Sequence, residues 1–280
     1  MTTLFGNIKK MKVSVDENAQ AQYQLPIGES LVNMNEAIGK HIKVSFAGII
    51  NCVNCNRQTK KSFNQGYCFV CLRKLAQCDT CIIKPEQCHY DQGTCREPQW
   101  GEANCLQDHF VYLSNTGQIK IGITKFIGEE VSSRWIDQGA NQAIAIYRVK
   151  ERLHSGLLET HIAQSVGDKT NWRTMLKGTA DKLDLLSMKQ KVYELAADKV
   201  REMQAEFGIQ AVQELDTPPV EINYPVNQYP VKIKSINLDK EGEFEGQLLG
   251  IKGQYLMLDG DRVINIRKYT GYEWELNIAS

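Results

Sequence analysis

The sequence predicts an α+β protein with β-rich, barrel-like segments at both ends, a cysteine-rich metal-binding module, and a small α/β unit followed by a long helix. Polar and apolar residues alternate near both ends of the chain, which is typical of half-buried strands. Eight of the nine cysteines fall between Cys52 and Cys95, and the residues after them switch between strand-like and helix-like periods. With 280 residues, 42% of them hydrophobic, the chain is long enough for two or three compact units.

The first β-rich segment covers residues 1–50. Alternation runs over residues 8–15, and a second strand-like stretch covers residues 41–50. Residues 23–49 and 224–251 share a loose order of residue types, with a proline soon after a tyrosine and a glycine-isoleucine pair at the end. Two explanations of this similarity are open: an ancient duplication, or one β-barrel built from both chain ends.

The second half of the chain predicts an α/β unit at residues 108–180, a helix and linker at 181–217, and a β domain at 218–280. Within the linker region, residues 184–207 place apolar side chains at the spacing of one helix face, and Gly208 follows as a stop. We expect this helix to pack against the rest of the protein.

The sequence shows no sign of export or of membrane insertion. Residues 1–13 lack an apolar run of signal-peptide length, and nowhere do about 18 consecutive apolar residues occur. We therefore expect a cytoplasmic protein with no membrane partner. Because reducing pools keep cytosolic thiols free, we expect the cysteines to bind metal rather than to form disulfides.

The first metal site is predicted at two Cys-x-x-Cys pairs, within a module that covers residues 51–107. Cys52 and Cys55 form one pair, and after twelve intervening residues Cys68 and Cys71 form the other, a separation typical of zinc ribbons and treble clefs. Two thiolates three residues apart reach one ion because the backbone turns tightly between them. Two such pairs leave no open position for water or substrate, so we expect a structural zinc.

A second structural zinc is predicted from the less regular cysteines that follow. Its expected ligands are Cys78, Cys81, Cys88 and Cys95. His89, Cys105 or His109 can take the place of one of them. An iron–sulfur cluster uses the same thiolates, so the pattern leaves the metal open, with zinc as the expectation for both sites.

The chain as a whole carries no net positive charge that would attract a polyanion. Lys and Arg total 33, as do Asp and Glu, so any nucleic-acid site has to be local. Basic residues flank the first two cysteine pairs, and aromatic residues between them add a surface suited to base stacking. The predicted nucleic-acid-binding residues are Arg57, Lys60, Lys61, Arg73 and Lys74. The alternative is a solvated basic face over a small core.

Residues 109–176 resemble the GIY-YIG nuclease superfamily in the order of their residue types. Tyr112 stands at the tyrosine of the first motif. Ile119-Lys120-Ile121-Gly122 matches the second motif with lysine in place of its tyrosine. Arg134 stands at the catalytic arginine of the superfamily, and Glu159 stands at its metal-binding glutamate.

The resemblance implies in-line attack on a phosphodiester. In such a reaction Tyr112 would orient the attacking water, Arg134 would neutralise the phosphate, and Glu159 would hold Mg²⁺ or Mn²⁺. Lys120 supplies a cation but not the proton transfer of a tyrosine, and this departure counts against cleavage.

The whole chain is also similar to an uncharacterised bacterial family, domain of unknown function 2797. The similarity lies in Gly66-Tyr67-Cys68, Cys88-His89-Tyr90, Gly93-Thr94-Cys95-Arg96 and residues 134–140. This resemblance implies no function.

Two functional hypotheses follow from the sequence. The first is a zinc-dependent nucleic-acid or nucleoprotein-binding factor on a degenerate GIY-YIG-like scaffold, associated with a large machine such as RNA polymerase or the ribosome. The alternative is a divalent-metal-dependent GIY-YIG-type endonuclease that acts on DNA or RNA. Lys120, the barrel-like chain ends and the closed zinc sites favour the binding factor.

Overall fold

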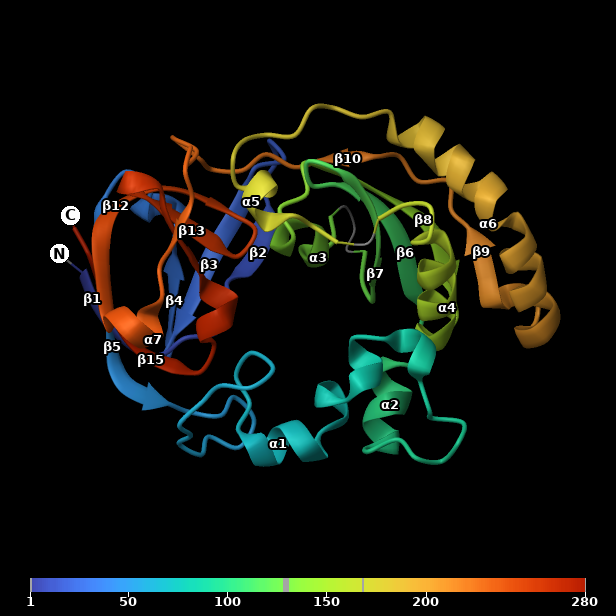
Figure 1. The fold of residues 1–280 in the computed structure, drawn as a ribbon, viewed down its shortest axis with the longest axis horizontal. Helices are drawn as coiled ribbons and strands as arrows, with labels where there is room; N and C mark the ends of the chain where they lie inside the picture. The colour runs from blue at the N-terminus through green and yellow to red at the C-terminus, as the bar shows by residue number, and fades with distance from the viewer. Residues whose placement is uncertain (1, 128–130, 168, 280) are drawn as a thin grey trace.

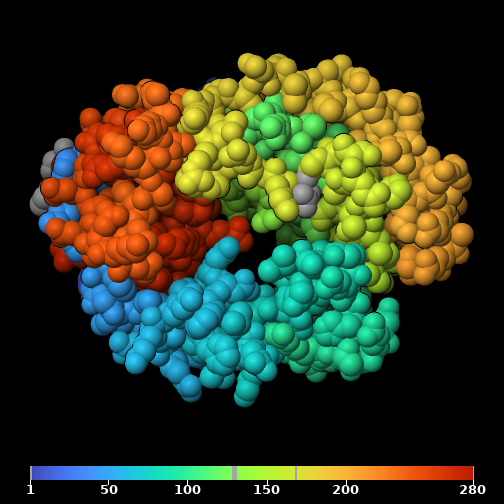
Figure 2. All heavy atoms as spheres, in the orientation of Figure 1, coloured from blue at the N-terminus to red at the C-terminus, as the bar shows by residue number. Residues whose placement is uncertain are grey.

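The computed structural model describes residues 2–127, 131–167 and 169–279. It confirms a mixed α+β fold with a cysteine-rich segment and one long helix. In Figure 1 the sheet formed by the chain ends lies on one side, the α/β unit lies on the other, and the cysteine-rich segment runs between them. Figure 2 shows a hollow at the centre of this face, with the cyan and teal cysteine-rich segment along one border.

Both chain ends enter one seven-stranded sheet. Its strands span Thr2–Asn7 (β1), His41–Ile50 (β5), Lys234–Ser235 (β11), Glu243–Lys252 (β12), Tyr255–Leu258 (β13), Arg262–Asn265 (β14) and Tyr272–Ile278 (β15). The strand order is β1, β15, β5, β12, β13, β14, β11, and only the β11–β14 pair is parallel. Because the order ends at β1 and β11, the barrel-like chain ends form an open sheet and not a closed barrel.

A smaller antiparallel sheet completes the core of the chain ends. Its three strands are β2 (Lys12–Val15), β3 (Ala21–Ile27) and β4 (Ser30–Asn33). Tyr23 and Leu25 on β3 are fully buried, because alternate side chains of a strand point to the same face. They share one core with Trp274 of β15, which explains why the alternating pattern occurs at both ends of the chain.

The α/β unit is built around a central strand that is buried on both faces. Its strands and covering helices span His109–Asn115 (β6), Ile119–Thr124 (β7), Gln142–Val149 (β8), Val212–Glu214 (β9), Val220–Glu221 (β10), Arg152–Ile162 (α4) and Leu185–Phe207 (α6). β6 lies between β7 and β8, and the short strands β9 and β10 pair with β8. Val111 and Leu113 face α4 and α6, whereas Tyr112 joins the core of the chain-end sheets. The two halves of the molecule therefore meet at β6.

The long helix α6 follows the predicted apolar spacing. The carboxylate of Asp184 accepts a hydrogen bond from the Ser187 amide at 3.0 Å, which caps the first turn. Gly208 ends the helix with a φ of +93°, a conformation that favours glycine. The other short helices outside the cysteine-rich segment are α3 (Ser133–Asp137), α5 (Trp172–Met175) and α7 (Leu238–Glu241). Among the helices in the described part of the chain, α6 included, we find none with the length and apolar character needed to cross a membrane.

The cysteine-rich segment has little regular structure. It contains α1 (Phe69–Lys74), α2 (Pro98–Asn104) and three 3₁₀ turns at Ala76–Cys78, Thr80–Ile82 and Pro85–Gln87. Its apolar cluster around the first cysteine pairs consists of three cysteines with Tyr67 and Leu75 packed against them. So few buried apolar groups cannot hold a segment of this length, so its fold depends on other interactions.

The two ends of the cysteine-rich segment are anchored to different halves of the molecule. At one end the Asn51 amide donates to the Gly271 carbonyl at 2.8 Å, and Ser62 Oγ donates to the Thr270 carbonyl at 3.2 Å. At the other end α4 approaches so closely that a Cβ on Gly156 would lie 2.7 Å from the carbonyl carbon of Pro85. The segment therefore spans the hollow and forms one of its walls.

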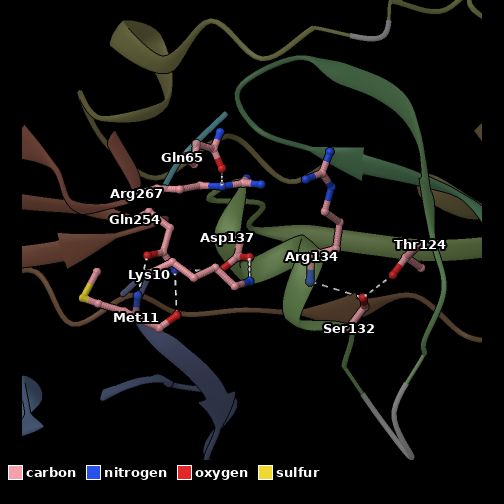
Figure 3. Close-up of polar contacts among 9 residues, drawn as sticks. All are labelled: Lys10, Met11, Gln65, Thr124, Ser132, Arg134, Asp137, Gln254 and Arg267. Atoms are coloured by element: carbon pink, nitrogen blue, oxygen red, sulfur yellow. Dashed lines mark hydrogen bonds and ion pairs between the residues drawn. The ribbon is translucent and has the colours of Figure 1, made fainter. Parts of the chain in front are cut away.

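Gln254 joins three elements where the two halves meet (Figure 3). Its side-chain oxygen accepts from the Met11 amide at 2.9 Å, and its amide donates to the Met11 carbonyl at 3.0 Å and to Asp137 Oδ1 at 2.7 Å. Lys10 adds an ion pair with Asp137 at 2.7 Å. Because Asp137 ends α3, these contacts also set the position of that helix.

We predict that Gln254→Ala lowers the free energy of unfolding by about 3 kcal/mol, because three buried partners lose their hydrogen bonds, one of them a carboxylate. Chemical denaturation measures this change. Gln228→Ala is the matched control, since Gln228 is exposed, and it should change stability by less than about 0.5 kcal/mol. Equal effects of the two substitutions would contradict this description of the contact between the halves.

Candidate functional site

Four cysteines form a compact group at the start of the cysteine-rich segment. The sulfurs of Cys52, Cys55, Cys68 and Cys71 all lie within 4.8 Å of one another, and the Cys55 and Cys68 sulfurs are 3.8 Å apart. Thiolates at about 2.3 Å from a tetrahedral zinc lie about 3.8 Å apart, so the spacing matches this metal. Cys55 is exposed and the other three are buried. The group could hold a zinc ion, as the two Cys-x-x-Cys pairs indicate.

The local backbone prepares these sulfurs to bind a cation. Burial opposes ionisation of Cys52, but hydrogen bonds from the Cys55, Cys68 and Asn54 amides outweigh this effect and lower its pKa to about 6. Cys68 caps α1, and its sulfur accepts from the Cys71 amide at 3.5 Å. Four thiolates in so small a space repel one another, and a divalent cation offsets that repulsion.

The other predicted metal ligands separate into different places. Cys81, Cys88 and Cys95 line a small cavity together with Cys105. Cys78 does not line this cavity; burial raises the pKa of its thiol, and the side chain of Asn64 partly opposes this effect. His89 lies close to Asp79 and Cys81, whereas His109 is buried and contacts the Gln107 carbonyl at 2.7 Å.

A cleft of about 570 Å³ lies between the cysteine-rich segment and the rest of the molecule. Of the side chains that line it in the described part of the chain, five are cationic and one is a carboxylate. The cations are Lys120, Lys125, Arg134, Arg152 and Arg267, and the carboxylate is Glu159. The opposite wall is formed by residues of the cysteine-rich segment: Asn64, Gln65, Tyr67, Gln77, Ile82 and Ile83. A chain with no net charge therefore concentrates positive charge in this cleft.

Different elements bring the charged residues into the cleft. Lys120 comes from β7, Arg134 from α3, and Arg267 from the 3₁₀ turn Ile266–Tyr269 between β14 and β15. Arg152 and Glu159 lie seven residues apart on α4, which places them two turns apart on one face of the helix. Three of the four residues predicted as catalytic, Lys120, Arg134 and Glu159, thus line the same cleft.

Tyr112, the fourth of these residues, lies behind the cleft wall. It is fully buried, its hydroxyl donates to Gln138 Oε1 at 2.9 Å, and its ring packs edge-on against Trp135 with the centroids 5.7 Å apart. Burial raises the pKa of Tyr112 to about 12, against the opposing effect of the nearby Arg134. The hydroxyl therefore keeps its proton at neutral pH and holds Gln138, which lines the cleft.

Gly122 makes room for this hydroxyl. A Cβ at Gly122 would lie 2.6 Å from both Cζ and Oη of Tyr112, closer than atoms approach in a packed core. Packing against Tyr112 therefore explains why a glycine occupies position 122, the glycine of the second motif. Trp135 and Gly139, in the segment 135–140, are a core residue and a helix stop, since Gly139 has a φ of +72°.

The arginines of the cleft face one another. Figure 3 shows the guanidinium groups of Arg134 and Arg267 extending toward the same space, with Arg267 held by a hydrogen bond to Gln65 Oε1. Burial lowers the pKa of Arg267, and the charge of Arg134 lowers it further. Burial and Arg134 also lower the pKa of Arg152. This repulsion costs free energy, and a bound anion would offset it.

The predicted nucleic-acid-binding residues form a separate surface. Arg57, Lys60, Lys61, Arg73 and Lys74 are all exposed and none lines the cleft. Lys61 Nζ lies 5.4 Å from the centre of the Phe63 ring, and the Arg73 guanidinium lies 6.0 Å from that of Phe69. The two rings are 5.7 Å apart, so cations and aromatic faces alternate there.

Sequence reasoning missed several residues of the cleft. Arg152 precedes Glu159 by two helical turns, and that spacing could have identified it. Arg267 and Lys125 carry no such signal, because they reach the cleft only through the pairing of distant strands and the position of the cysteine-rich segment.

The fold and the site define an α+β protein with a four-cysteine metal-binding group next to a cationic cleft. The model of the family "Protein of unknown function (DUF2797)" matches residues 39–274, which include all nine cysteines and every residue that lines the cleft. The chain belongs to this family. No significant match to a curated protein or to a solved structure was found.

We predict that Cys55→Ser removes the zinc bound at the first group, because three thiolates no longer complete the tetrahedral shell. Elemental analysis of the purified variant should show about one zinc ion fewer per chain than the native protein. Limited proteolysis should cut within residues 52–71. The exposed Lys60→Ser variant is the control and should keep its zinc. A Cys55→Ser protein with unchanged zinc would contradict the assignment.

A second prediction concerns Gly122→Ala, which should destabilise the protein by about 1–3 kcal/mol because the added methyl collides with Tyr112. Gly167→Ala is the control, since a Cβ there meets no atom within 4 Å. Chemical denaturation of both variants measures the difference. A Gly122→Ala protein as stable as the control would show that the space beside Tyr112 is not restricted.

Proposed function

We propose that the protein binds nucleic acid, with the phosphate backbone lying in the cationic cleft. The observation that carries this proposal is the charge of the cleft, where five cations and one carboxylate gather in a chain whose total charge is zero. Phosphates supply the negative charge that such a cleft lacks, and Arg pairs bind their oxygens through several hydrogen bonds at once.

The residues of the opposite wall of the cleft also support the proposal of nucleic-acid binding. Tyr67 offers an aromatic face, and Asn64, Gln65 and Gln77 offer amide donors and acceptors. The exposed surface around Phe63 and Phe69 lies on the same cysteine-rich segment and extends the contact area. In this proposal the first metal group is structural and fixes the wall on which these residues stand.

The ligand of this site is the backbone of DNA or RNA, free or within a nucleoprotein machine of the cytoplasm. RNA polymerase and the ribosome both present such backbones, and a small factor with a structural zinc is suited to that kind of association. This part of the proposal rests on the chemistry of the cleft alone.

A specific observation favours a second candidate, a divalent-metal-dependent endonuclease of the GIY-YIG type. Among the described residues that line the cleft, Glu159 is the one carboxylate, and it shares the cleft with Arg134 and Lys120. The hairpin of β6 and β7, helix α3, strand β8 and helix α4 also follow the order that the resemblance implies. Glu159 would hold Mg²⁺ or Mn²⁺ and Arg134 would neutralise the phosphate. The buried, protonated Tyr112 and the lysine at position 120 weigh against cleavage.

We predict that Arg134→Ala and Arg267→Ala each weaken binding of short DNA and RNA strands by about tenfold or more, because each loses charged hydrogen bonds to phosphate. Fluorescence anisotropy at two salt concentrations measures the affinity and its salt dependence, which should be smaller for both variants. Arg201→Ala, on the exposed side of α6, is the control. The proposal fails if the three variants bind equally well.

A cleavage assay decides between the binding factor and the endonuclease. The native protein and Glu159→Gln are each incubated with Mg²⁺ or Mn²⁺ and with plasmid, single-stranded DNA or RNA. The binding proposal predicts intact substrates. If the native protein cleaves a substrate and Glu159→Gln does not, the binding proposal is wrong and the nuclease takes its place.

A further inference from the structure

A second group of cysteines encloses a cavity at the end of the cysteine-rich segment that lies near α4. Four of them line one space of about 20 Å³: Cys81, Cys88, Cys95 and Cys105. They come from separate places, since Cys81 lies in the 3₁₀ turn Thr80–Ile82, Cys88 follows the turn Pro85–Gln87, and Cys105 ends α2. Four thiols that reach one cavity from separate turns are placed to share one bound group.

We propose that Cys81, Cys88, Cys95 and Cys105 bind an iron–sulfur cluster. Four cysteine sulfurs are the usual ligand set of such a cluster, and each thiol loses its proton when its sulfur binds iron. The inference is independent of nucleic-acid binding, because it rests on this cavity and its lining.

The spacing of the sulfurs favours a cluster over a single zinc ion. In the first group the ligand atoms lie within 4.8 Å of one another, and among the residues that the structure describes the four sulfurs of this second group do not form so compact a set. The tetrahedral shell of one zinc ion brings its four sulfurs into contact, whereas the ligands of an iron–sulfur cluster bind different iron atoms and lie further apart.

The lining of the cavity is suited to a cluster. Ala76, Ile82 and Trp100 surround the sulfurs with apolar groups that keep water away from iron and sulfide. Gly101 lies against the same space, where a Cβ would be 3.4 Å from the Cys95 sulfur and 3.1 Å from the Tyr90 ring. A larger residue at position 101 would reduce the room next to Cys95.

Asp79 and His89 lie close to Cys81 and are the competing ligands for a single metal ion. Both are engaged elsewhere. Asp79 Oδ2 forms an ion pair with Arg96 Nε at 2.7 Å, and Asp79 Oδ1 accepts from the Thr80 amide at 2.6 Å. His89 Nδ1 is hydrogen-bonded to Thr94 Oγ1 at 2.8 Å. Asp79 and His89 also line the cavity, where His89 Nε2 lies 3.4 Å from Asp79 Oδ2. Because these two side chains partner each other and their neighbours, the proposal assigns the four cysteines as the ligands.

The proposed cluster lies next to the cleft. Ile82 lines both the cysteine cavity and the cleft, and its carbonyl accepts a hydrogen bond from Arg152 at 2.6 Å. The Arg152 amide donates to the carbonyl of Cys105 at 2.8 Å. Nε of Arg152 is buried with no hydrogen-bond partner in the described residues. A cluster bound by four thiolates is anionic, so it would offset the charge of this buried arginine.

The test is a metal and sulfide analysis of the full chain purified without oxygen, and of the same protein after treatment with ferric iron, sulfide and a thiol reductant, which together supply both oxidation states of iron. We expect equal amounts of iron and acid-labile sulfide, visible absorption from sulfur-to-iron charge transfer, and about one zinc ion per chain at the first group. Two zinc ions per chain with no iron or sulfide in either preparation would overturn the proposal.

Two matched variants locate the ligands. Cys105→Ser should lose iron, sulfide and visible absorption while its zinc stays, and the retained zinc shows that the segment is still folded. Cys78→Ser should keep all of them, because Cys78 lies outside the cavity. Loss of the cluster in Cys78→Ser with retention in Cys105→Ser would overturn the ligand set. If Cys105→Ser does not fold, Cys95→Ser provides the same comparison.

Discussion

The rest of the site depends on the metal group formed by Cys52, Cys55, Cys68 and Cys71. The segment around these residues has short helices and a small apolar cluster, and burial of that cluster cannot hold it in place. A metal ion held by these four cysteines would supply the missing free energy and set the path of the chain between Ile50 and α1. One wall of the cleft consists of residues from this segment, so the cleft exists only when the segment is ordered.

The opposite side of the cleft is built from residues far apart in the sequence. The pairing of β15 with both β1 and β5 brings the chain ends together, and the turn before β15 then delivers Arg267 to a space shared with Arg134. Gathering like charges lowers stability unless an anion is present. Arg134, Arg152 and Arg267, kept together in a partly buried cleft, therefore support the proposal that an anion binds there.

Local patterns predicted the parts of the molecule that local chemistry determines. The strand at residues 41–50 (β5), the helix face of α6 and the two Cys-x-x-Cys pairs were all predictable, because each depends on spacings of two to four residues. The sequence did not show which cysteines of the second group line one cavity or where Arg267 lies, since both depend on which turns meet in space. Spacing favours Cys78 as a partner of Cys81, whereas the fold places Cys105 beside Cys81 and leaves Cys78 near Asn64.

The most direct test of this account is hydrogen–deuterium exchange with zinc bound and after its removal by a chelator. The account predicts that removal speeds exchange at the amides of Val53, Gly66 and Tyr67, whose hydrogen bonds belong to the metal-held segment, while β6 and β8 exchange as before. Unchanged exchange across residues 52–71 after complete loss of zinc would contradict it, because the wall of the cleft would then be ordered without the metal.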